Sequence, residues 1–132
     1  MEVVLFFVPW DDTMKMKTKE TEKQKGGETM ERKGILMRLR EGGGEMYEKY
    51  HAEVWPEMLA ILKKAGIENY SIWREGDLLF AYYEVEDMQK ASEILGGSSV
   101  HDEWRKLMRD YLWEDPTTGK NEWFMKEVFY LK

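Results

Sequence analysis

Two aromatic-rich segments separated by a short turn constrain the fold of this chain more than any other feature of its sequence. Residues 67–74 (IENYSIWR) and 78–85 (LLFAYYEV) have the composition of strands, and residues 75–77 (EGD) join them. A short loop that contains glycine, placed between two such segments, is typical of a β-hairpin. We therefore expect an antiparallel sheet built around this hairpin.

Tyr70 has a defined direction in the first strand of the hairpin. Because side chains alternate along a strand, Tyr70 should share one face with Ile72 and Arg74, while Trp73 points to the other face. This alternation would allow Tyr70 to point into a cavity.

Further strands and helices are predicted on both sides of the hairpin from hydrophobic periodicity and from glycine and proline positions. Trp55-Pro56 lies inside one helical pattern, and proline should kink or restart the helix there. Ser99, with Asp102 three residues later, resembles a capping box at the start of another helix. The predicted segments are a strand at 32–40, a helix at 45–64, a helix at 86–95, a helix from Ser99 to Leu112 and a closing strand at 123–131.

This order of elements, βαββαβ with one additional helix, predicts an α+β fold. The same order of elements is found in ferredoxin-like folds, in which helices cover one side of an antiparallel sheet. The length of 132 residues is sufficient for one hydrophobic core. The six tryptophans and seven tyrosines exceed what one small core needs. We therefore expect either that two sheets pair in a dimer or that the aromatic residues line a pocket.

Residues 1–29 differ from the rest of the chain and are called the leader below. Residues 1–10 contain the apolar run VVLFFV, which lacks a basic flank and is far shorter than the roughly 20 residues of a membrane span. Residues 11–29 are polar and charged, the composition of a flexible segment. The leader is either a strand-forming segment on a tether or translated sequence upstream of a natural start at Met30. We favour the second interpretation, with the folded domain at 30–132.

The composition excludes several classes of function. The net charge of −6 is spread along the chain, whereas nucleic-acid binding needs a concentrated basic face. With no cysteine there is no disulfide framework and no thiolate nucleophile, and zinc would depend on only two histidines. The sequence contains no glycine-rich phosphate loop and no H-E-x-x-H signature. These features are compatible with a reducing cytoplasm.

The strongest candidate for a functional site lies in the predicted helix at 45–64. Tyr47 and His51 are four residues apart, so their side chains should project from the same face, close to Trp55. An imidazole is the usual group for moving protons at neutral pH, and a phenol with an indole suits a polyhydroxylated ring. A small sugar site is our leading hypothesis. On spacing alone, a half-buried helix face is the more frequent explanation of such a pair.

Other conspicuous residues have simpler interpretations. His101 lies next to Ser99 and Asp102, so we expect it to be a surface or capping residue. Trp73 and the tryptophans at 113 and 123 are read as core or dimer contacts. The ten methionines are read as core filling rather than as a metal-binding set.

Five sequence blocks, taken together and in this order, resemble the L-rhamnose mutarotase family across residues 30–132. They are Tyr47-x-x-x-His51-x-x-x-Trp55-Pro56-Glu57, Gly66-Ile67-x-Asn69-Tyr70-Ser71-Ile72, Leu78-Leu79-Phe80-Ala81, Trp104-Arg105-Lys106-Leu107-Met108 and Glu127-Val128-Phe129-Tyr130-Leu131. The resemblance implies a homodimeric α+β barrel in the cytoplasm, with no metal and no organic cofactor. The family often has two adjacent tryptophans where this chain has Trp104-Arg105, which bears on the choice of sugar.

Carried over residue by residue, the resemblance implies that His51 is the proton donor. It also implies that Tyr47, Tyr70, Trp104 and Arg105 contact the sugar. The implied reaction interconverts the α and β anomers of L-rhamnose by acid–base opening and reclosure of the ring. The second proton-transfer group is open at this point: Tyr47, Tyr70 or a carboxylate could serve. A cofactor-free oxygenase or a non-catalytic stress protein with the same paired fold is the alternative.

Overall fold

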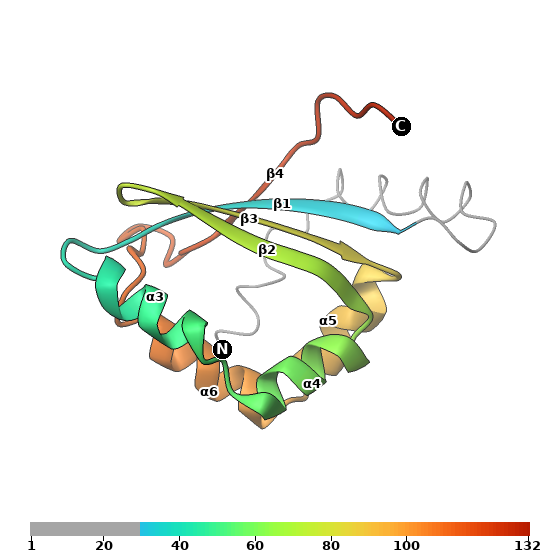
Figure 1. The fold of residues 1–132 in the computed structure, drawn as a ribbon, viewed down its shortest axis with the longest axis horizontal. Coiled ribbons are helices and arrows are strands. Elements are labelled where there is room, and N and C mark those ends of the chain that lie inside the picture. The colour runs from blue at the N-terminus through green and yellow to red at the C-terminus, as the bar shows by residue number, and fades with distance from the viewer. Residues whose placement is uncertain (1–29) are drawn as a thin grey trace.

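The computed structural model describes residues 30–132, and these fold around a four-stranded antiparallel sheet (Figure 1). The strand order is β2-β3-β1-β4, and every neighbouring pair is antiparallel. This is the strand order of the ferredoxin-like fold, so the predicted fold class is confirmed. The predictions for the leader lie outside the described residues. The strands are β1 (Glu31–Arg38), β2 (Ile67–Glu75), β3 (Leu78–Val85) and β4 (Trp123–Met125).

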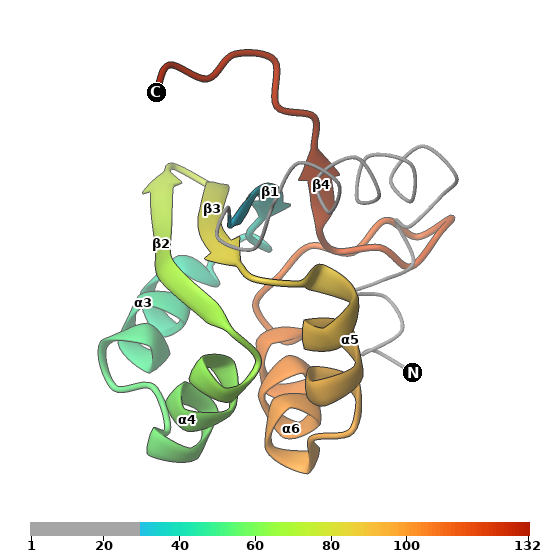
Figure 2. The same ribbon diagram turned by 90° about the vertical axis from the view of Figure 1, so that its right-hand side faces the viewer.

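The helices of the described residues all lie on one face of this sheet (Figures 1 and 2). They form two pairs, one between β1 and β2 and the other between β3 and β4. The opposite face carries no helix of residues 30–132. The helices are α3 (Gly44–Ala52), α4 (Pro56–Lys64), α5 (Met88–Gly96) and α6 (Ser99–Met108).

Strand β3 shows how the sequence produces this one-sided arrangement. Ala81, Tyr83 and Val85 face the helices and are 3%, 0% and 0% exposed. Phe80, which alternates with them, is 44% exposed on the opposite face. Period-two alternation therefore gives each face of the strand its own surface, and the helix-side surface forms the core.

Pro56 divides the predicted helix at 45–64 into α3 and α4. The chain is extended at Trp55, which caps α4, and Pro56 occupies the first turn, where its missing N–H removes no helical hydrogen bond. This confirms the restart expected at Trp55-Pro56. The two helices therefore meet at an angle beside the end of α3 that carries His51.

The boundaries of α6 differ from the prediction. Its N-cap is Ser98 rather than Ser99, because the extended Ser98 accepts the backbone N–H of His101 through its hydroxyl at 3.1 Å. The helix ends at Met108, and Leu112 forms an isolated β-bridge with Leu39 instead of extending the helix. Tertiary pairing with the chain after β1 therefore takes over where helical periodicity alone predicted four more residues.

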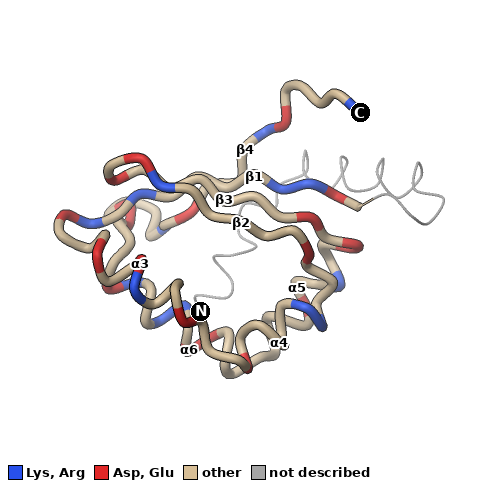
Figure 3. The backbone as a smooth tube through the Cα atoms, viewed as in Figure 1, with Lys and Arg blue, Asp and Glu red and all other residues tan. Residues whose placement is uncertain are grey.

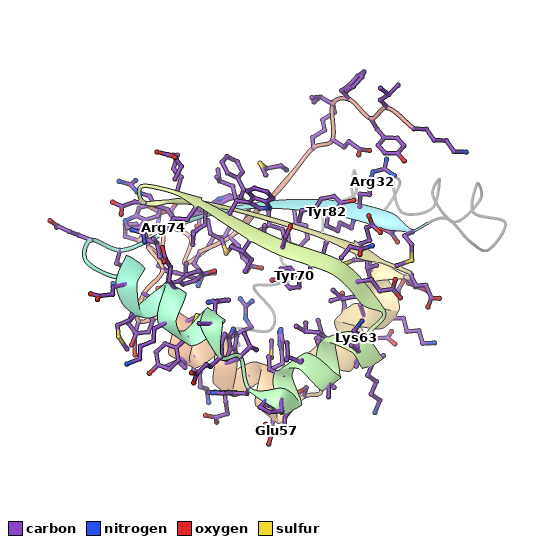
Figure 4. All side chains as sticks on the ribbon, in the orientation of Figure 1. Arg32, Glu57, Lys63, Tyr70, Arg74 and Tyr82 are labelled. Carbon is purple, nitrogen blue, oxygen red and sulfur yellow. The ribbon has the colours of Figure 1, made fainter. Side chains whose placement is uncertain are left out.

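The predicted closing strand at 123–131 is wrong beyond Met125. β4 pairs with β1 over only three residues, and residues 126–132 turn away from the sheet (Figure 2). Arg32 of β1 forms a two-point ion pair with Glu127 at 2.8 and 2.9 Å, and its guanidinium lies 3.4 Å from the ring centre of Tyr130 (Figure 4). Side-chain contacts with Arg32 thus replace the backbone ladder. Val128, Phe129 and Leu131 are 86%, 78% and 80% exposed.

Charged residues of both signs are interspersed over the described residues (Figure 3). Acidic and basic positions both occur along the helices and near the strand ends of the backbone. This agrees with the spread of charge expected from the sequence. None of the helices in residues 30–132 has the length and apolar character needed to cross a bilayer.

Candidate functional site

An inner cavity of about 80 Å³ lies between the sheet and the helices. All five predicted site residues line it: Tyr47, His51, Tyr70, Trp104 and Arg105. They come from α3, β2 and α6, which are far apart in the sequence. The fold therefore brings the predicted set together at one place.

An outer groove of about 400 Å³ adjoins the inner cavity. Tyr47, His51 and Ile72 line both spaces, and Glu48 and Arg74 lie on the outer one. Small-molecule sites usually occupy roughly 300 to 1,000 Å³. The inner cavity alone is too small for a sugar ring, so a ligand of that size would extend past Tyr47 and His51, which line both spaces, into the groove.

Tyr47 and His51 stack on one face of α3. Their ring centres are 4.2 Å apart with an interplanar angle of 28°. Tyr47 is 4% exposed, while His51 is half-buried at the boundary between cavity and groove. The predicted helical pairing is confirmed, and it places an imidazole within reach of a ligand in either space.

A backbone hydrogen bond fixes the tautomer of His51. Its Nδ1 lies 2.8 Å from the carbonyl oxygen of Tyr47. A carbonyl can only accept, so Nδ1 carries a hydrogen and Nε2 is the nitrogen that can exchange a proton with a ligand. Burial lowers the pKa of His51, and the hydrogen bond to Tyr47 only partly offsets this effect.

The imidazole of His51 packs against one tryptophan, which in turn packs against a second. Trp104 meets the His51 ring edge-on, with centres 5.3 Å apart at 81°. Trp55 in turn meets Trp104 at 5.0 Å and 87°. Edge-to-face contacts of this kind restrict ring rotation. Trp55, which caps α4, and Trp104 of α6 therefore limit the orientation of a side chain on α3.

A β-bulge directs Tyr70 toward the cavity. Asn69 and Tyr70 together oppose one residue of β3, and Asn69 has a positive φ of 52°. The extra residue shifts the alternation, so that Tyr70 and Ile72 line the cavity, whereas Trp73 bonds to Ser71 on the opposite face. Figure 4 shows Tyr70 on the helix side of the sheet. The predicted orientation of Tyr70 is confirmed.

The phenols of the cavity remain neutral over the physiological pH range. Burial raises the pKa values of Tyr47, Tyr70 and Tyr83, and the carboxyl of Glu122 raises each of them further. Tyr70 is 42% exposed as a residue, but the shift reports on its hydroxyl, which lies at the enclosed end of the ring close to Glu122 and Arg105. These hydroxyls are therefore suited to donate hydrogen bonds and are poor bases.

The sequence did not reveal the acidic and amide side chains of the cavity. Asn121 and Glu122, immediately before β4, are 4% and 9% exposed and line the cavity. Glu122 Oε2 lies 3.6 Å from Arg105 Nη1. The loop before β4 places them there, because Trp113 N–H donates to the carbonyl of Arg38 at 2.7 Å and β4 then pairs with β1. No local pattern around residues 113–122 indicates this return.

His101 was wrongly predicted to be a surface or capping residue. It is 4% exposed and lines the inner cavity, and only its backbone N–H takes part in the cap. Position 101 lies one turn before Trp104 and Arg105 on α6, so the amphipathic face of this helix includes it. Burial, helped by the charge of Arg105, lowers the pKa of His101 to about 4.

Within residues 30–132, no group of three or more acidic, histidine or cysteine side chains has the arrangement of a metal site.

A family model described as L-rhamnose mutarotase matches residues 32–131. The chain belongs to the L-rhamnose mutarotase family. A mutarotase is an isomerase, so family membership places this chain among enzymes of that class.

Relatives in this family match the chain over nearly their whole length. The L-rhamnose mutarotase of Listeria monocytogenes is 40% identical over 104 residues, which is 77% of this chain and 99% of that protein. The L-rhamnose mutarotase of Oceanobacillus iheyensis is 36% identical over the same shares of the two chains. The crystal structure of an L-rhamnose mutarotase from Formosa agariphila has a TM-score of 0.65 at 28% identity and covers 77% of this chain and 99% of that one.

Proposed function

We propose that this protein interconverts the α and β anomers of L-rhamnose. The observation that carries the proposal is the convergence of Tyr47, His51, Tyr70 and Trp104 on one cavity in a chain of the L-rhamnose mutarotase family. An oxygenase or a non-catalytic stress protein would not require this set, and the family match does not favour either. The function therefore rests on the site as well as on the fold.

The cavity offers a 6-deoxyhexose both polar and apolar contacts. The neutral hydroxyls of Tyr47 and Tyr70 can donate to ring hydroxyls, and Trp104 presents an indole beside them. Apolar side chains also line the inner cavity and suit the methyl group and the apolar face of the sugar. They include Met37, Met58, Leu62, Ile72, Leu95 and Met108.

Anomer exchange requires one proton to reach the ring oxygen and another to leave the anomeric hydroxyl. His51 is proposed to deliver the first proton through Nε2, since Nδ1 is held by the carbonyl of Tyr47. When the ring recloses, the same nitrogen recovers the proton. Acid–base help of this kind is worth about 10² to 10⁴ in rate, which suits a reaction that also proceeds in water.

The burial of His51 has a defined effect on this role. A lowered pKa makes the imidazolium a stronger acid and reduces the fraction present at neutral pH. The fraction of His51 that is protonated falls as the pH rises through that lowered value. Activity that depends on the imidazolium should therefore decline on the alkaline side at a lower pH than for a solvent-exposed histidine.

Saturation-transfer NMR tests the function directly. Saturating the anomeric proton of α-L-rhamnose should reduce the β signal when the protein is present at micromolar concentration, because exchange then becomes fast relative to relaxation. L-Mannose, which differs from L-rhamnose only by a hydroxymethyl group in place of the methyl, serves as the comparison sugar. If the exchange rate of L-rhamnose is the same with and without protein, the proposal is wrong.

A homodimer is proposed to form through the open face of the sheet. Trp73, Phe80 and Met125 are 68%, 44% and 40% exposed there, and contiguous apolar surface of this kind usually marks an interface. The apolar residues of the C-terminal segment 126–132 extend beyond the sheet and would add to the contact. A cytoplasmic location is proposed on the family resemblance, and cell fractionation tests it.

A further inference from the structure

The inner cavity is lined by a buried ion pair as well as by the proposed catalytic histidine, His51. Glu122 lies before β4 and Arg105 lies on α6, and their side chains are 11% and 10% exposed. Among the described residues that line this cavity, Glu122 has the only carboxyl group. Burying a carboxyl costs free energy unless its charge is paired or its proton retained, so its presence in the same cavity as His51 calls for a chemical explanation.

We infer that Glu122 is the second proton-transfer residue of the site, with Arg105 as its positioning residue. The inference rests on the mutarotase function proposed above and identifies the group that exchanges a proton with the anomeric hydroxyl. Neither the position of Glu122 in the sequence nor the family resemblance assigned it a role.

The contacts of the carboxyl group leave one oxygen for a ligand. Oε2 lies 3.6 Å from Arg105 Nη1, whereas Oε1 is buried and accepts no hydrogen bond. Oδ1 of the neighbouring Asn121 is also a buried acceptor without a donor. A buried acceptor left unsatisfied costs roughly 1 to 3 kcal/mol, and a sugar hydroxyl is a donor that would satisfy it. Arg105 holds one carboxyl oxygen while the other stays available to the substrate.

Other candidates for this role fit less well. Tyr47 and Tyr70 have raised pKa values, so as phenols they hold their protons and cannot act as bases near neutral pH. Glu48 lies on the outer groove, but its side chain is 63% exposed and is bound to Arg74 at 2.6 Å. Within residues 30–132, only Glu122 combines a carboxyl group, burial and a place on the inner cavity.

The environment strengthens both members of the pair for proton transfer. Burial raises the pKa of Glu122 by more than Arg105 lowers it, which makes its carboxylate a stronger base. Burial lowers the pKa of His51, which makes its imidazolium a stronger acid. These shifts move the two pKa values toward each other, which lowers the free-energy cost of transferring a proton from His51 to Glu122 through the sugar.

The proton movements balance across one turnover. In ring opening, the Glu122 carboxylate takes the proton of the anomeric hydroxyl, the electrons of that O–H bond form the carbonyl, and the bond from the anomeric carbon to the ring oxygen breaks. The ring oxygen takes the proton from His51 Nε2. The residue pair thus changes from imidazolium and carboxylate to imidazole and carboxylic acid, which burial favours. After the aldehyde rotates, reclosure on its other face reverses each transfer.

The Glu122→Gln variant tests the inference, because the amide keeps the shape of the side chain but cannot exchange a proton with the sugar. We expect kcat for anomer exchange to fall about 10²-fold or more with KM changed little, the loss typical of removing an acid–base group. Glu122→Asp retains a carboxyl group and should recover part of the rate. Glu127→Gln is the matched control, since Glu127 also pairs with an arginine but lies outside the cavity, and it should exchange at the wild-type rate.

Wild-type exchange by a folded Glu122→Gln variant would overturn the inference, as would equal losses in the Asp and Gln variants. If Glu122→Gln does not fold, the wild-type pH profile decides. The active form of His51 and Glu122 holds one proton between the two residues, so kcat/KM should rise and then fall as the pH increases. A kcat/KM that only rises or only falls with pH would also overturn the inference. Failure of the proposed function is distinguishable, because the wild-type protein itself would then exchange no anomers of L-rhamnose.

Discussion

The two faces of the sheet are built from the same strands but differ in what they bury. On the helix side, Tyr83 is 0% exposed and neighbours a cavity that contains the polar groups of His51, Glu122 and Asn121. On the open side, Phe80 and Trp73 are 44% and 68% exposed. Burial shifts the pKa values of the polar groups on the helix side, whereas contiguous exposed apolar surface usually marks contact with a partner. The helix side should therefore carry the chemistry and the open side the assembly.

Substitution of His51 should have the largest effect, because it should reduce the catalytic rate without changing the assembly. His51→Ala should slow anomer exchange by about 10²-fold or more, since it removes the acid for the ring oxygen. The oligomeric state and melting temperature should change little, because His51 is only half-buried. Saturation-transfer NMR, together with analytical ultracentrifugation, measures both properties. Lys49→Ala, an exposed position on the same helix, is the control for effects on α3.

Phe80→Lys should disrupt the dimer and leave the activity per chain unchanged. A charge at the centre of the open face would have to be desolvated on pairing, so the dimer should dissociate to monomers at micromolar concentration. Sedimentation velocity measures this change, and the activity per chain should persist because every proposed site residue belongs to one chain. Leu59→Lys, at a residue 51% exposed on α4, should leave the oligomeric state unchanged. A wild-type protein that sediments as a stable monomer would contradict the proposed assembly.

His101 provides a pH test of burial on the helix side. Its pKa in the folded state is about 4, below the usual value near 6.5, so the unfolded chain binds the proton more readily. Above pH 6.5 neither state is protonated and stability is unaffected. As the pH falls from 6.5 to 4, stability should drop by about 3 kcal/mol through this residue.

Comparison with His101→Gln isolates this contribution from the opposing one of Glu122, whose raised pKa favours the folded state in acid. Arg105 and Asp102 are the charged groups that act on His101. In urea unfolding, the free energy of unfolding should decrease more between pH 7 and pH 4 for the wild type than for the variant. Equal decreases would mean that the imidazole is solvated and that the cavity opens at this end.

Tyr47→Phe should have a smaller effect. The variant keeps the stacked ring and loses one donor to the sugar, which corresponds to about 1 kcal/mol, or a roughly fivefold rise in KM with little change in kcat. Tyr82→Phe is the matched control, because the Tyr82 hydroxyl binds Glu84 on the open face at 2.7 Å. A large fall in kcat for Tyr47→Phe would instead indicate that this phenol takes part in proton transfer.

Local patterns predicted most elements of the fold and the part of the site formed by Tyr47, His51 and Tyr70. Helical spacing placed Tyr47 beside His51, and glycine, proline and alternating apolar residues located β2, β3 and the break before α4. The orientation of Tyr70 was predicted by counting alternation from within its own strand, although the bulge at Asn69 that maintains it was not foreseen. These features depend on residues that are close in sequence.

The remainder depends on contacts between distant segments. Glu122 reaches the cavity because the loop after α6 returns to pair with β1, and no periodicity in residues 113–122 encodes that return. The prediction for His101 was wrong because a polar residue near a helix start usually caps the helix, whereas here Ser98 supplies the cap. The end of β4 was misplaced because Arg32 binds Glu127 through its side chain, an interaction that strand propensity does not describe.

Deletion of residues 1–29 should have the smallest effect. It tests whether the leader contributes to the open face of the sheet. The family match begins at residue 32, and residues 11–29 have little apolar surface to bury. If residues 30–132 form the complete domain, the melting temperature, dimer affinity and exchange rate should stay nearly unchanged. The apolar run VVLFFV is the one part of the leader that could contribute, by adding a strand or covering the open face. A fall of several degrees in melting temperature would show that it does so, and a shift in dimerisation alone would place its effect on the open face of the sheet.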